Sequence, residues 1–222
     1  MTPRPSPGVQ AAGSLGPPDL ARQRAAFAER SRRYALRGFD RTTAAEIAVQ
    51  LLDPVAGPVL DVGTGKGLLA RALAARGGLV LSVDPDRAEG ELAALLCAEA
   101  GVRDRVRFVG ADAAELPFPD GLFRAAAAMD VLHHLDDPVP VLAEMARTLH
   151  PEGKLLLADF SRQGFELVAA VHREEGREHP ESGVTLDDAI GCLAAAGFAV
   201  LERRSEHWHD LAVLARVATR SG

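Results

Sequence analysis

The fold of this chain is decided by residues 59–70, which read VLDVGTGKGLLA. A short β-prone run ending at Val62 meets three alternate glycines, Gly63, Gly65 and Gly67, and a helix-forming segment rich in Leu, Ala and Arg follows. Glycine lets the backbone turn tightly and approach a ligand closely, and the first turn of a helix offers N–H groups that lack partners. A strand, a glycine turn and a helix N-terminus in this order predict a nucleotide-binding turn.

The spacing of the glycines separates two classes of nucleotide site. The dinucleotide fingerprint G-x-G-x-x-G requires a glycine at position 68, where this chain has Leu68. The pattern is instead G-x-G-x-G, with Asp61 two residues before the first glycine. It fits a nicotinamide-dependent oxidoreductase poorly, although that class shares the glycine turn.

Composition and charge indicate a globular protein. The chain has 222 residues, of which 47% are hydrophobic and 25% are charged, and its formal net charge is −6. A negative net charge argues against a nucleic acid as substrate. No apolar run reaches the roughly 18 residues of a membrane-spanning helix, and the N-terminus lacks the apolar segment of a signal peptide. Cys97 and Cys192 are expected to be reduced core residues, so the expected compartment is the cytoplasm.

The first 54 residues predict two segments. Residues 1–18 hold five prolines and little to bury, which predicts a disordered tail. Residues 19–54 predict a small helical cap with two helices, the first beginning at Asp19 as its N-cap and the second capped by Thr42 or Thr43. The aromatic side chains of this cap are expected to cover the ligand pocket, to pack against the sheet edge, or to do both.

From residue 55 to residue 222, strand and helix patterns alternate. Strands are expected at residues 58–62, 79–83, 105–109, 123–129, 154–160, 198–204 and 211–217, and helices at residues 68–75, 87–100, 139–149, 163–178 and 186–196. This alternation predicts an α/β, Rossmann-like fold with a seven-stranded, mostly parallel sheet and helices on both faces. The last two strands are too close for a helical crossover, so they predict a C-terminal antiparallel hairpin. The segment 123–129 is mostly alanine, and only the alternation makes it a strand.

Acidic residues lie at four of the expected strand ends. The ligands of an open parallel sheet bind at the carboxyl ends of its strands. Asp84 is placed there to accept hydrogen bonds from both hydroxyls of a ribose, and Asp112 to accept one from an adenine amino group. Asp130 is expected to contact the same ligand or to cap the turn over residues 131–135. Each acid alone is also explained as a helix cap or turn former, but chance explains four of them poorly.

Residues 59–160 resemble the class I S-adenosylmethionine-dependent methyltransferases, in the type 11 group that includes the ubiquinone and menaquinone C-methyltransferases. The matching motifs are VLDVGTGKG, VDPD, GADAAELPFPDGLF, VLHHLDDP and LAEMARTLHPEGKLLLADF, in that order. The resemblance implies that residues 55–222 form the methyltransferase domain and that S-adenosylmethionine is the cofactor. The cofactor-binding residues that it implies are Asp61, Gly63, Thr64 and Gly65 for the methionine part, Asp84 and Pro85 for the ribose, Asp112 and Ala113 for the adenine, and Asp130.

Two residues depart from the family pattern. Arg124 stands where an aspartate commonly follows the phenylalanine of PDGLF, and Glu152 replaces the first glycine of a PGG turn. Both are expected to lie away from the ligand, so neither threatens cofactor binding. Because the family methylates C, N, O and S atoms, the resemblance leaves the acceptor open.

Histidines gather on the expected catalytic side. Six of the seven histidines follow strands or lie in segments that reach this side, with only His150 opposite, and the six are His133, His134, His172, His179, His207 and His209. The candidate catalytic residues are His134, His172 and His179. Since the sulfonium is already activated, a base is needed only if the acceptor must lose a proton.

Two sets of residues could in principle bind a metal ion. His172, Glu175 and His179 recur at i, i+3 and i+7 of one expected helix, so they share a face that suits a transition metal or a substrate, or is merely solvated. Asp130 and Asp159 end neighbouring strands, as the magnesium ligands do in catechol-type O-methyltransferases. That family follows the second aspartate with asparagine, whereas this chain has a phenylalanine there. No metal is therefore predicted.

The predicted function is transfer of the methyl group of S-adenosylmethionine to a small-molecule acceptor by in-line displacement. The expected partners are the cofactor and a small-molecule acceptor, and neither nucleic acid nor a membrane span is expected. A homodimer is one possible oligomeric state. Two alternatives remain, an NAD(P)-dependent oxidoreductase of Rossmann type and a protein that binds S-adenosylmethionine without catalysis.

Overall fold

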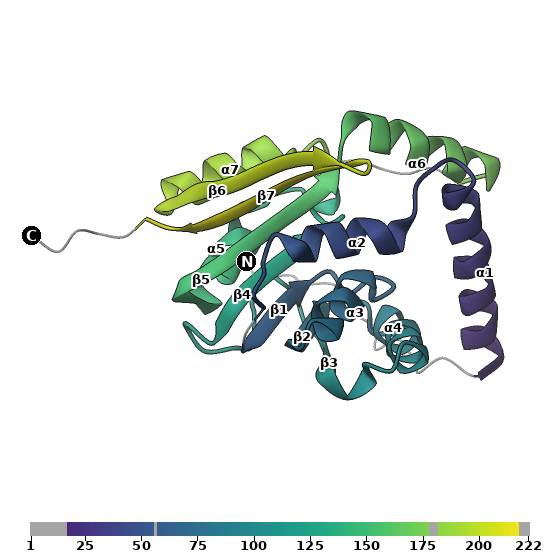
Figure 1. The fold of residues 1–222 in the computed structure, drawn as a ribbon, viewed down its shortest axis with the longest axis horizontal. Coiled ribbons are helices and arrows are strands. Elements are labelled where there is room, and N and C mark those ends of the chain that lie inside the picture. The colour runs from purple at the N-terminus through teal and green to yellow at the C-terminus, as the bar shows by residue number, and fades with distance from the viewer. Residues whose placement is uncertain (1–16, 56, 178–181, 218–222) are drawn as a thin grey trace, which may run out of the picture.

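Seven strands form one sheet with helices on both faces (Figure 1). The computed structural model describes residues 17–55, 57–177 and 182–217. The strands are β1 (Pro58–Val62), β2 (Leu79–Asp84), β3 (Val106–Gly110), β4 (Phe123–Met129), β5 (Leu149–Phe160), β6 (Phe198–Glu206) and β7 (His209–Arg216). The helices are α1 (Pro17–Ala35), α2 (Arg41–Gln50), α3 (Leu68–Ala75), α4 (Arg87–Glu99), α5 (Val139–Thr148), α6 (Arg162–Glu174) and α7 (Leu186–Ala195).

The strand order is β3-β2-β1-β4-β5-β7-β6. The neighbours from β3 to β5 are parallel, and β7 runs antiparallel to both β5 and β6. The predicted Rossmann-like sheet with its terminal hairpin is thus confirmed. The order reverses at β1, which lies between β2 and β4, and a ligand crevice is expected at such a switch point.

Alternate residues of each inner strand enter two different cores. Val59 of β1 packs with helices α2, α3 and α4, whereas the next residue, Leu60, packs with α5 and α7 on the other face. The alanines of β4 follow the same rule, with Ala125 and Ala127 on one face and Ala126 on the other. Strands buried on both faces carry continuous apolar runs, so the strand predicted at residues 123–129 is confirmed despite its helix-forming composition.

Several expected boundaries are wrong at the N-terminal end. Helix α1 begins at Pro17, so Asp19 lies in its first turn and is not its N-cap. The rest of the predicted tail, residues 1–16, lies outside the described residues. Helix α2 is capped by Asp40, whose Oδ1 accepts from the N–H of Thr42 at 2.8 Å, and not by either threonine.

The C-terminal half needs two further corrections. Strand β5 begins at Leu149 and not at residue 154. Helix α6 ends at Glu174 and not at residue 178, because Gly176 takes a left-handed conformation with φ +67°. Both cysteines are free, with Cys97 buried and Cys192 half-buried. Among the helices of the described residues, none combines the length and apolar character needed to cross a bilayer.

The hairpin between β6 and β7 holds the N-terminal helices against the sheet. Its two turn residues, His207 and Trp208, both have positive φ, as a two-residue turn between twisted strands requires. Trp208 Nε1 donates to the carbonyl of Gly38 at 3.2 Å. Phe39 is buried, and its ring lies 6.1 Å from that of Phe160. The segment between α1 and α2 is therefore packed at the carboxyl edge of the sheet.

Replacing Gly164 with alanine should destabilise the fold, because α6 passes very close to the hairpin at this residue. A Cβ at this position would lie 2.2 Å from the carbonyl oxygen of Trp208. Such overpacking costs about 1–3 kcal/mol of the free energy of unfolding, measured by urea denaturation. Gly191→Ala on α7 is the control, because nothing lies within 4 Å of its Cβ and alanine favours the helix. If Gly164→Ala stabilises the protein as the control should, the close approach is wrong.

Candidate functional site

The glycine turn after β1 brings its backbone close to the ends of β2 and β4. The N–H of Gly63 donates to the carbonyl of Val83 at 2.9 Å, and the N–H of Gly65 donates to Asp84 Oδ2 at 3.2 Å. Gly63 has φ +82°, and a Cβ there would lie 2.3 Å from Cγ2 of Val131. Only glycine fits this position, because both its backbone conformation and its surroundings exclude a side chain.

Asp61 lies beneath the turn, in a buried chain of hydrogen bonds. The Ser82 hydroxyl donates to Asp61 Oδ2 at 2.6 Å, so the Thr64 hydroxyl, 2.7 Å from Ser82 Oγ, must be the donor of that second bond. Asp61 Oδ1 is buried and has no hydrogen-bond partner among the described residues. Burial raises the pKa of Asp61 to about 7, although the Ser82 bond opposes it. The direct ligand contact expected of Asp61 needs correction, because Asp61 does not line the cavity above the turn.

Replacing Asp61 with asparagine should change how stability depends on pH. The pKa of this carboxyl is higher in the folded chain than in the unfolded one, so the unfolded state ionises first and stability falls as the pH rises from about 4 to about 7. Asp61→Asn removes that loss, so between pH 5 and 8 the variant should gain about 2–3 kcal/mol relative to the parent. Urea unfolding at both pH values measures this, with the exposed Asp104→Asn as control. Parallel pH curves for parent and Asp61→Asn would contradict the assignment.

A cavity of about 520 Å³ opens above the glycine turn at the carboxyl edge of the sheet. All the predicted cofactor residues except Asp61 line it, namely Gly63, Thr64, Gly65, Asp84, Pro85, Asp112, Ala113 and Asp130. The carboxylate of Asp84 is oriented by the N–H groups of Gly65 and Asp86, and burial raises its pKa. The cavity therefore combines a glycine cradle with carboxylates on two neighbouring strand ends, which fits a nucleoside.

Asp130 is paired with a histidine of the hairpin. Its Oδ1 lies 2.8 Å from Nε2 of His209, and Asp130 itself has φ +59°. Burial opposes ionisation of both groups, but their attraction outweighs it, so the pKa of Asp130 is lowered and that of His209 is raised. His209 thus acts through Asp130 and does not line the cavity.

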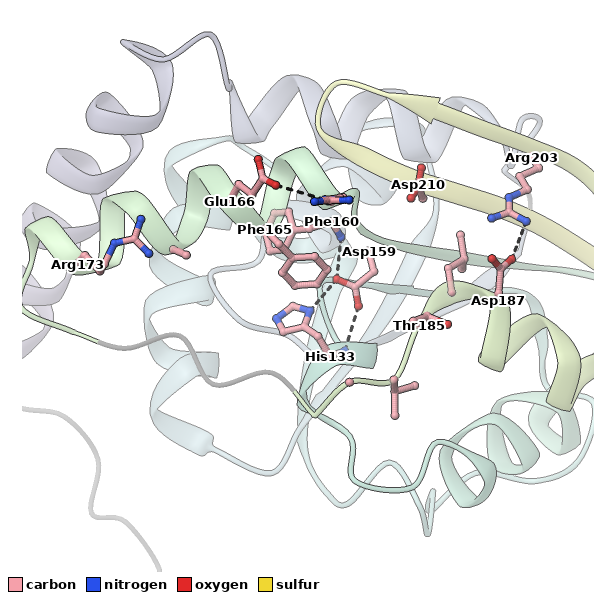
Figure 2. Close-up of a pocket in the computed structure, with 15 residues that line it drawn as sticks. His133, Asp159, Phe160, Phe165, Glu166, Arg173, Thr185, Asp187, Arg203 and Asp210 are labelled. Carbon is pink, nitrogen blue, oxygen red and sulfur yellow. Dashed lines mark hydrogen bonds and ion pairs between the residues drawn. The ribbon is translucent and has the colours of Figure 1, made fainter.

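A second pair joins His133, after β4, to Asp159 near the end of β5 (Figure 2). Nδ1 of His133 lies 2.6 Å from Asp159 Oδ1, and the backbone N–H of His133 donates to Oδ2 at 3.1 Å. The N–H of Phe160 also donates to Oδ1, at 2.8 Å. The carboxylate holds Nδ1, so Nε2 is the ring nitrogen that faces away from Asp159. Asp130 and Asp159, which the sequence offered as a possible pair of magnesium ligands, each pair with a histidine.

Of the three histidines proposed as catalytic from the sequence, two line the cavity in the described part of the chain. His134 and the buried His172 line the cavity, whereas His179 lies outside the described residues. Glu175 follows the end of α6, and its carboxylate binds Nε of Arg30 at 2.9 and 3.0 Å. Because α6 ends at Glu174, Glu175 lies beyond the helix that was expected to carry all three residues. In the part of the chain that the structure describes, no three His, Cys, Asp or Glu side chains form a metal-binding group.

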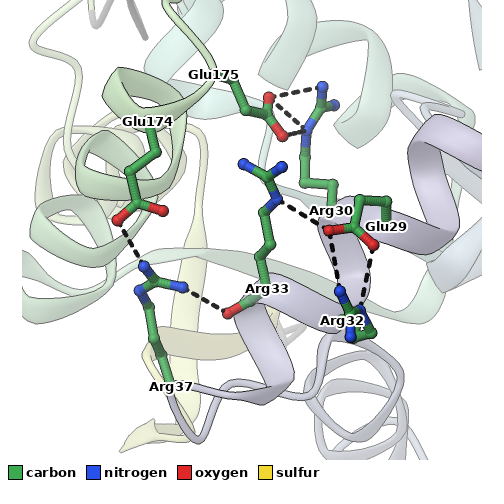
Figure 3. Close-up of polar contacts among 7 residues, drawn as sticks. All are labelled: Glu29, Arg30, Arg32, Arg33, Arg37, Glu174 and Glu175. Carbon is green, nitrogen blue, oxygen red and sulfur yellow. Dashed lines mark hydrogen bonds and ion pairs between the residues drawn. The ribbon is translucent and has the colours of Figure 1, made fainter.

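Ion pairs join α1 and the residues that follow it to the C-terminal end of α6 (Figure 3). Arg30 binds Glu175, and Arg37 binds Glu174 at 2.6 Å. Arg30, Tyr34 and Arg41 also line the cavity, with the Arg41 guanidinium 5.7 Å from the Tyr34 ring centroid. The sequence analysis did not identify these arginines. The signal that could have found them is the cluster of basic residues in α1 together with the acidic pair Glu174–Glu175 at the end of α6.

The two unusual family positions lie at the other end of the sheet. Arg124 Nη1 is 3.1 Å from Nδ1 of His150 and 3.7 Å from the carboxylate of Glu152. None of the three lines the cavity. His207 sits in the hairpin turn, where its Nε2 is 2.8 Å from the carbonyl of Asp40.

Comparison with known proteins identifies the family to which this chain is similar. The methyltransferase-domain family matches residues 60–157. The chain is 36% identical over 168 residues to 27-O-demethylrifamycin SV methyltransferase of Amycolatopsis mediterranei, covering 70% of this chain but only 61% of that protein. It is 38% identical over 179 residues to demethylmenaquinone methyltransferase of Clavibacter sepedonicus, covering 68% of this chain and 70% of that protein.

Solved structures agree on the fold. The crystal structure of the glycopeptide N-methyltransferase MtfA in complex with S-adenosylmethionine matches with a TM-score of 0.64 at 19% identity, over 79% of this chain and 94% of that chain. The demethylmenaquinone methyltransferase is 38% identical to this chain, which covers 70% of it. That similarity supports membership of the same family and not only a shared fold. This chain belongs to the class I S-adenosylmethionine-dependent methyltransferases.

Proposed function

We propose that this protein transfers the methyl group of S-adenosylmethionine to an oxygen atom of a small-molecule acceptor. The observation that carries the choice of oxygen is the pairing of His133 with Asp159, because His133 lines the cavity beside the glycine turn. A hydroxyl acceptor must lose a proton as it is methylated, and an imidazole oriented by a carboxylate is a common group to take that proton.

The cavity residues are assigned to the parts of the cofactor by their positions. In the proposal, Gly63, Thr64 and Gly65 hold the methionine part and Asp84 with Pro85 the ribose. Asp112 and Ala113 then hold the adenine, and Asp130 completes the site beside the reacting centre. Asp61 supports the turn from beneath through Ser82 and Thr64. The open space beside Gly65, where nothing lies within 4 Å of the position that a Cβ would take, supports a ligand close to the backbone of this turn.

The cofactor supplies an activated methyl group on a sulfonium. Attack by the acceptor oxygen forms the O–CH₃ bond as the S–CH₃ bond breaks, which leaves S-adenosylhomocysteine, and the hydroxyl proton passes to Nε2 of His133. Asp159 stabilises the resulting imidazolium through Nδ1. His134 and His172 are proposed to contact the acceptor, since both line the same cavity. Holding acceptor and cofactor in line supplies much of the remaining rate.

The relatives give this proposal its setting. One acts, by its name, on an oxygen of a rifamycin precursor and another on demethylmenaquinone, and both names describe small molecules. Family membership removes the NAD(P)-dependent oxidoreductase alternative. Binding of S-adenosylmethionine without catalysis is the alternative that the experiment must separate.

Calorimetry with S-adenosylhomocysteine, followed by product analysis, tests the proposal. The purified chain is expected to bind S-adenosylhomocysteine and, with S-adenosylmethionine, to methylate a member of a panel of phenols, hydroquinones and hydroxylated macrocycles. Heteronuclear NMR of the product should connect the new methyl group to oxygen. Connection to carbon would overturn the choice of atom. Tight cofactor binding with no product across the panel would favour the non-catalytic alternative, and absence of binding would end the proposal.

A further inference from the structure

A second cavity, of about 650 Å³, adjoins the cofactor cavity (Figure 2). It lies between α6, the segment 183–187 at the start of α7, and the hairpin strands β6 and β7. Its volume is typical of a site for a drug-sized molecule. The residues assigned to the cofactor do not account for it, because none of the glycine turn, Asp84 or Asp112 lines it.

The two cavities share a wall made of aromatic rings. His133 and Phe160 line both cavities, and Phe165 of α6 lines the second. The His133 ring centroid lies 5.6 Å from that of Phe160 and 5.3 Å from that of Phe165, with the phenylalanines 5.5 Å apart. The proton-accepting histidine proposed above therefore stands between the cofactor and this second space.

The walls of the second cavity are apolar with a polarised rim. Phe160, Phe165, Ala169, Val184 and Leu186 supply apolar surface. Most of the charged groups are neutralised in pairs, namely Asp159 by His133, Glu166 by Arg162, and Asp187 by Arg203, which also faces Asp210.

Arg173 of α6 differs from these pairs. It lines the second cavity, and its guanidinium forms no ion pair or hydrogen bond with another described residue. In Figure 2 it lies at one end of the cavity, while Asp187, Arg203 and Asp210 lie at the other. An exposed guanidinium at the mouth of an aromatic cavity favours a planar ligand that carries an anionic group.

We infer that the second cavity holds the body of the methyl acceptor, an aromatic molecule with an anionic substituent that faces Arg173 and a hydroxyl that reaches His133. This inference rests on the proposed function and specifies its substrate class. In this arrangement the ring system of the acceptor stacks on the aromatic side chains of the shared wall. The first cavity then holds only the nucleoside and the methionine part of the cofactor. The reacting oxygen then lies at the boundary, where His133 can take its proton.

A fluorescence titration tests the second cavity without the natural acceptor. The probe is anilinonaphthalene sulfonate, an aromatic anion that fluoresces in apolar surroundings, added to the full chain saturated with S-adenosylhomocysteine. We expect the probe to bind while S-adenosylhomocysteine stays bound. Arg173→Gln should weaken probe binding about three- to tenfold, the usual effect of losing one solvent-exposed hydrogen bond. Arg107→Gln, at an exposed position of β3, should leave it unchanged.

A cavity-filling variant gives a second, independent reading. Ala169 is half-buried and lines only the second cavity, so Ala169→Trp should remove probe binding and keep the affinity for S-adenosylhomocysteine. Displacement of the probe by S-adenosylhomocysteine, or unchanged probe binding in both Arg173→Gln and Ala169→Trp, would overturn the inference. Failure of the parent chain to bind S-adenosylhomocysteine would instead defeat the proposed function, so the two failures are distinguishable.

Discussion

Replacing His133 with alanine is expected to lower kcat for a hydroxyl acceptor by about 10²–10⁴-fold, the range for loss of a general base. The affinity for S-adenosylhomocysteine should change by less than about threefold, because the cofactor contacts come from other strand ends. Asp159→Asn should give a loss of similar direction, since it removes the carboxylate that holds Nδ1 at 2.6 Å. Steady-state kinetics with the acceptor found in the product screen measures both variants.

Two control variants make this result specific. His150→Ala changes a histidine at the opposite end of the sheet, where its partner is Arg124, and should leave kcat unchanged. Acceptors with more acidic hydroxyls should suffer less from loss of His133, because they need less help in losing the proton. If His134→Ala costs far more than His133→Ala, the base is the neighbouring histidine and the role of the His133–Asp159 pair is structural.

Replacing Gly63 with alanine is expected to weaken binding of S-adenosylhomocysteine by about 100-fold or more. A Cβ at this position would lie 2.3 Å from Cγ2 of Val131, and the residue has φ +82°. A clash and a left-handed conformation together cost about 2–4 kcal/mol, which the turn can relieve only by moving away from the ligand. Calorimetry measures the affinity, and the thermal unfolding midpoint shows whether the chain still folds.

Conformation and clash can be separated at this position. Gly121→Ala carries a similar positive φ, +68°, with nothing within 4 Å, so it controls for backbone strain and should leave cofactor affinity unchanged. Val131→Ala removes the clashing methyl group, so the double variant with Gly63→Ala should recover part of the lost affinity. Wild-type affinity in Gly63→Ala alone would show that the ligand does not depend on the shape of this turn.

The acidic residues predicted at the strand ends lie together because parallel strands end at one edge of a sheet. Asp84 and Asp112 follow neighbouring strands and line one cavity with the glycine turn, as the alternation of strands and helices led us to expect. The strand at 123–129 was also predictable, since its position between crossover segments outweighs the helix propensity of its alanines. Asp61 was misplaced because its strand position does not reveal that its side chain points under the turn.

The periodicity and spacing of the sequence did not reveal that His133 pairs with Asp159. His133 and His134 are adjacent in sequence, and only the short helical turn over residues 132–134 decides that His133 faces Asp159 on the neighbouring strand. The expected helical face of His172, Glu175 and His179 depended on a helix that continues past residue 174. Gly176 ends that helix early, and Arg30 of α1, far away in the sequence, takes the carboxylate of Glu175.

By itself the sequence determined the α/β fold, the glycine turn and the strand ends that surround the cofactor cavity, because these follow from local periodicity and from the parallel order of the strands. Tertiary structure alone decided which histidine meets Asp159, which arginines close over the cavity, and that a second cavity lies behind His133 and Phe160. Those features depend on side chains from elements far apart in the chain, whose contacts are set by packing and charge pairing, and no local pattern encodes them.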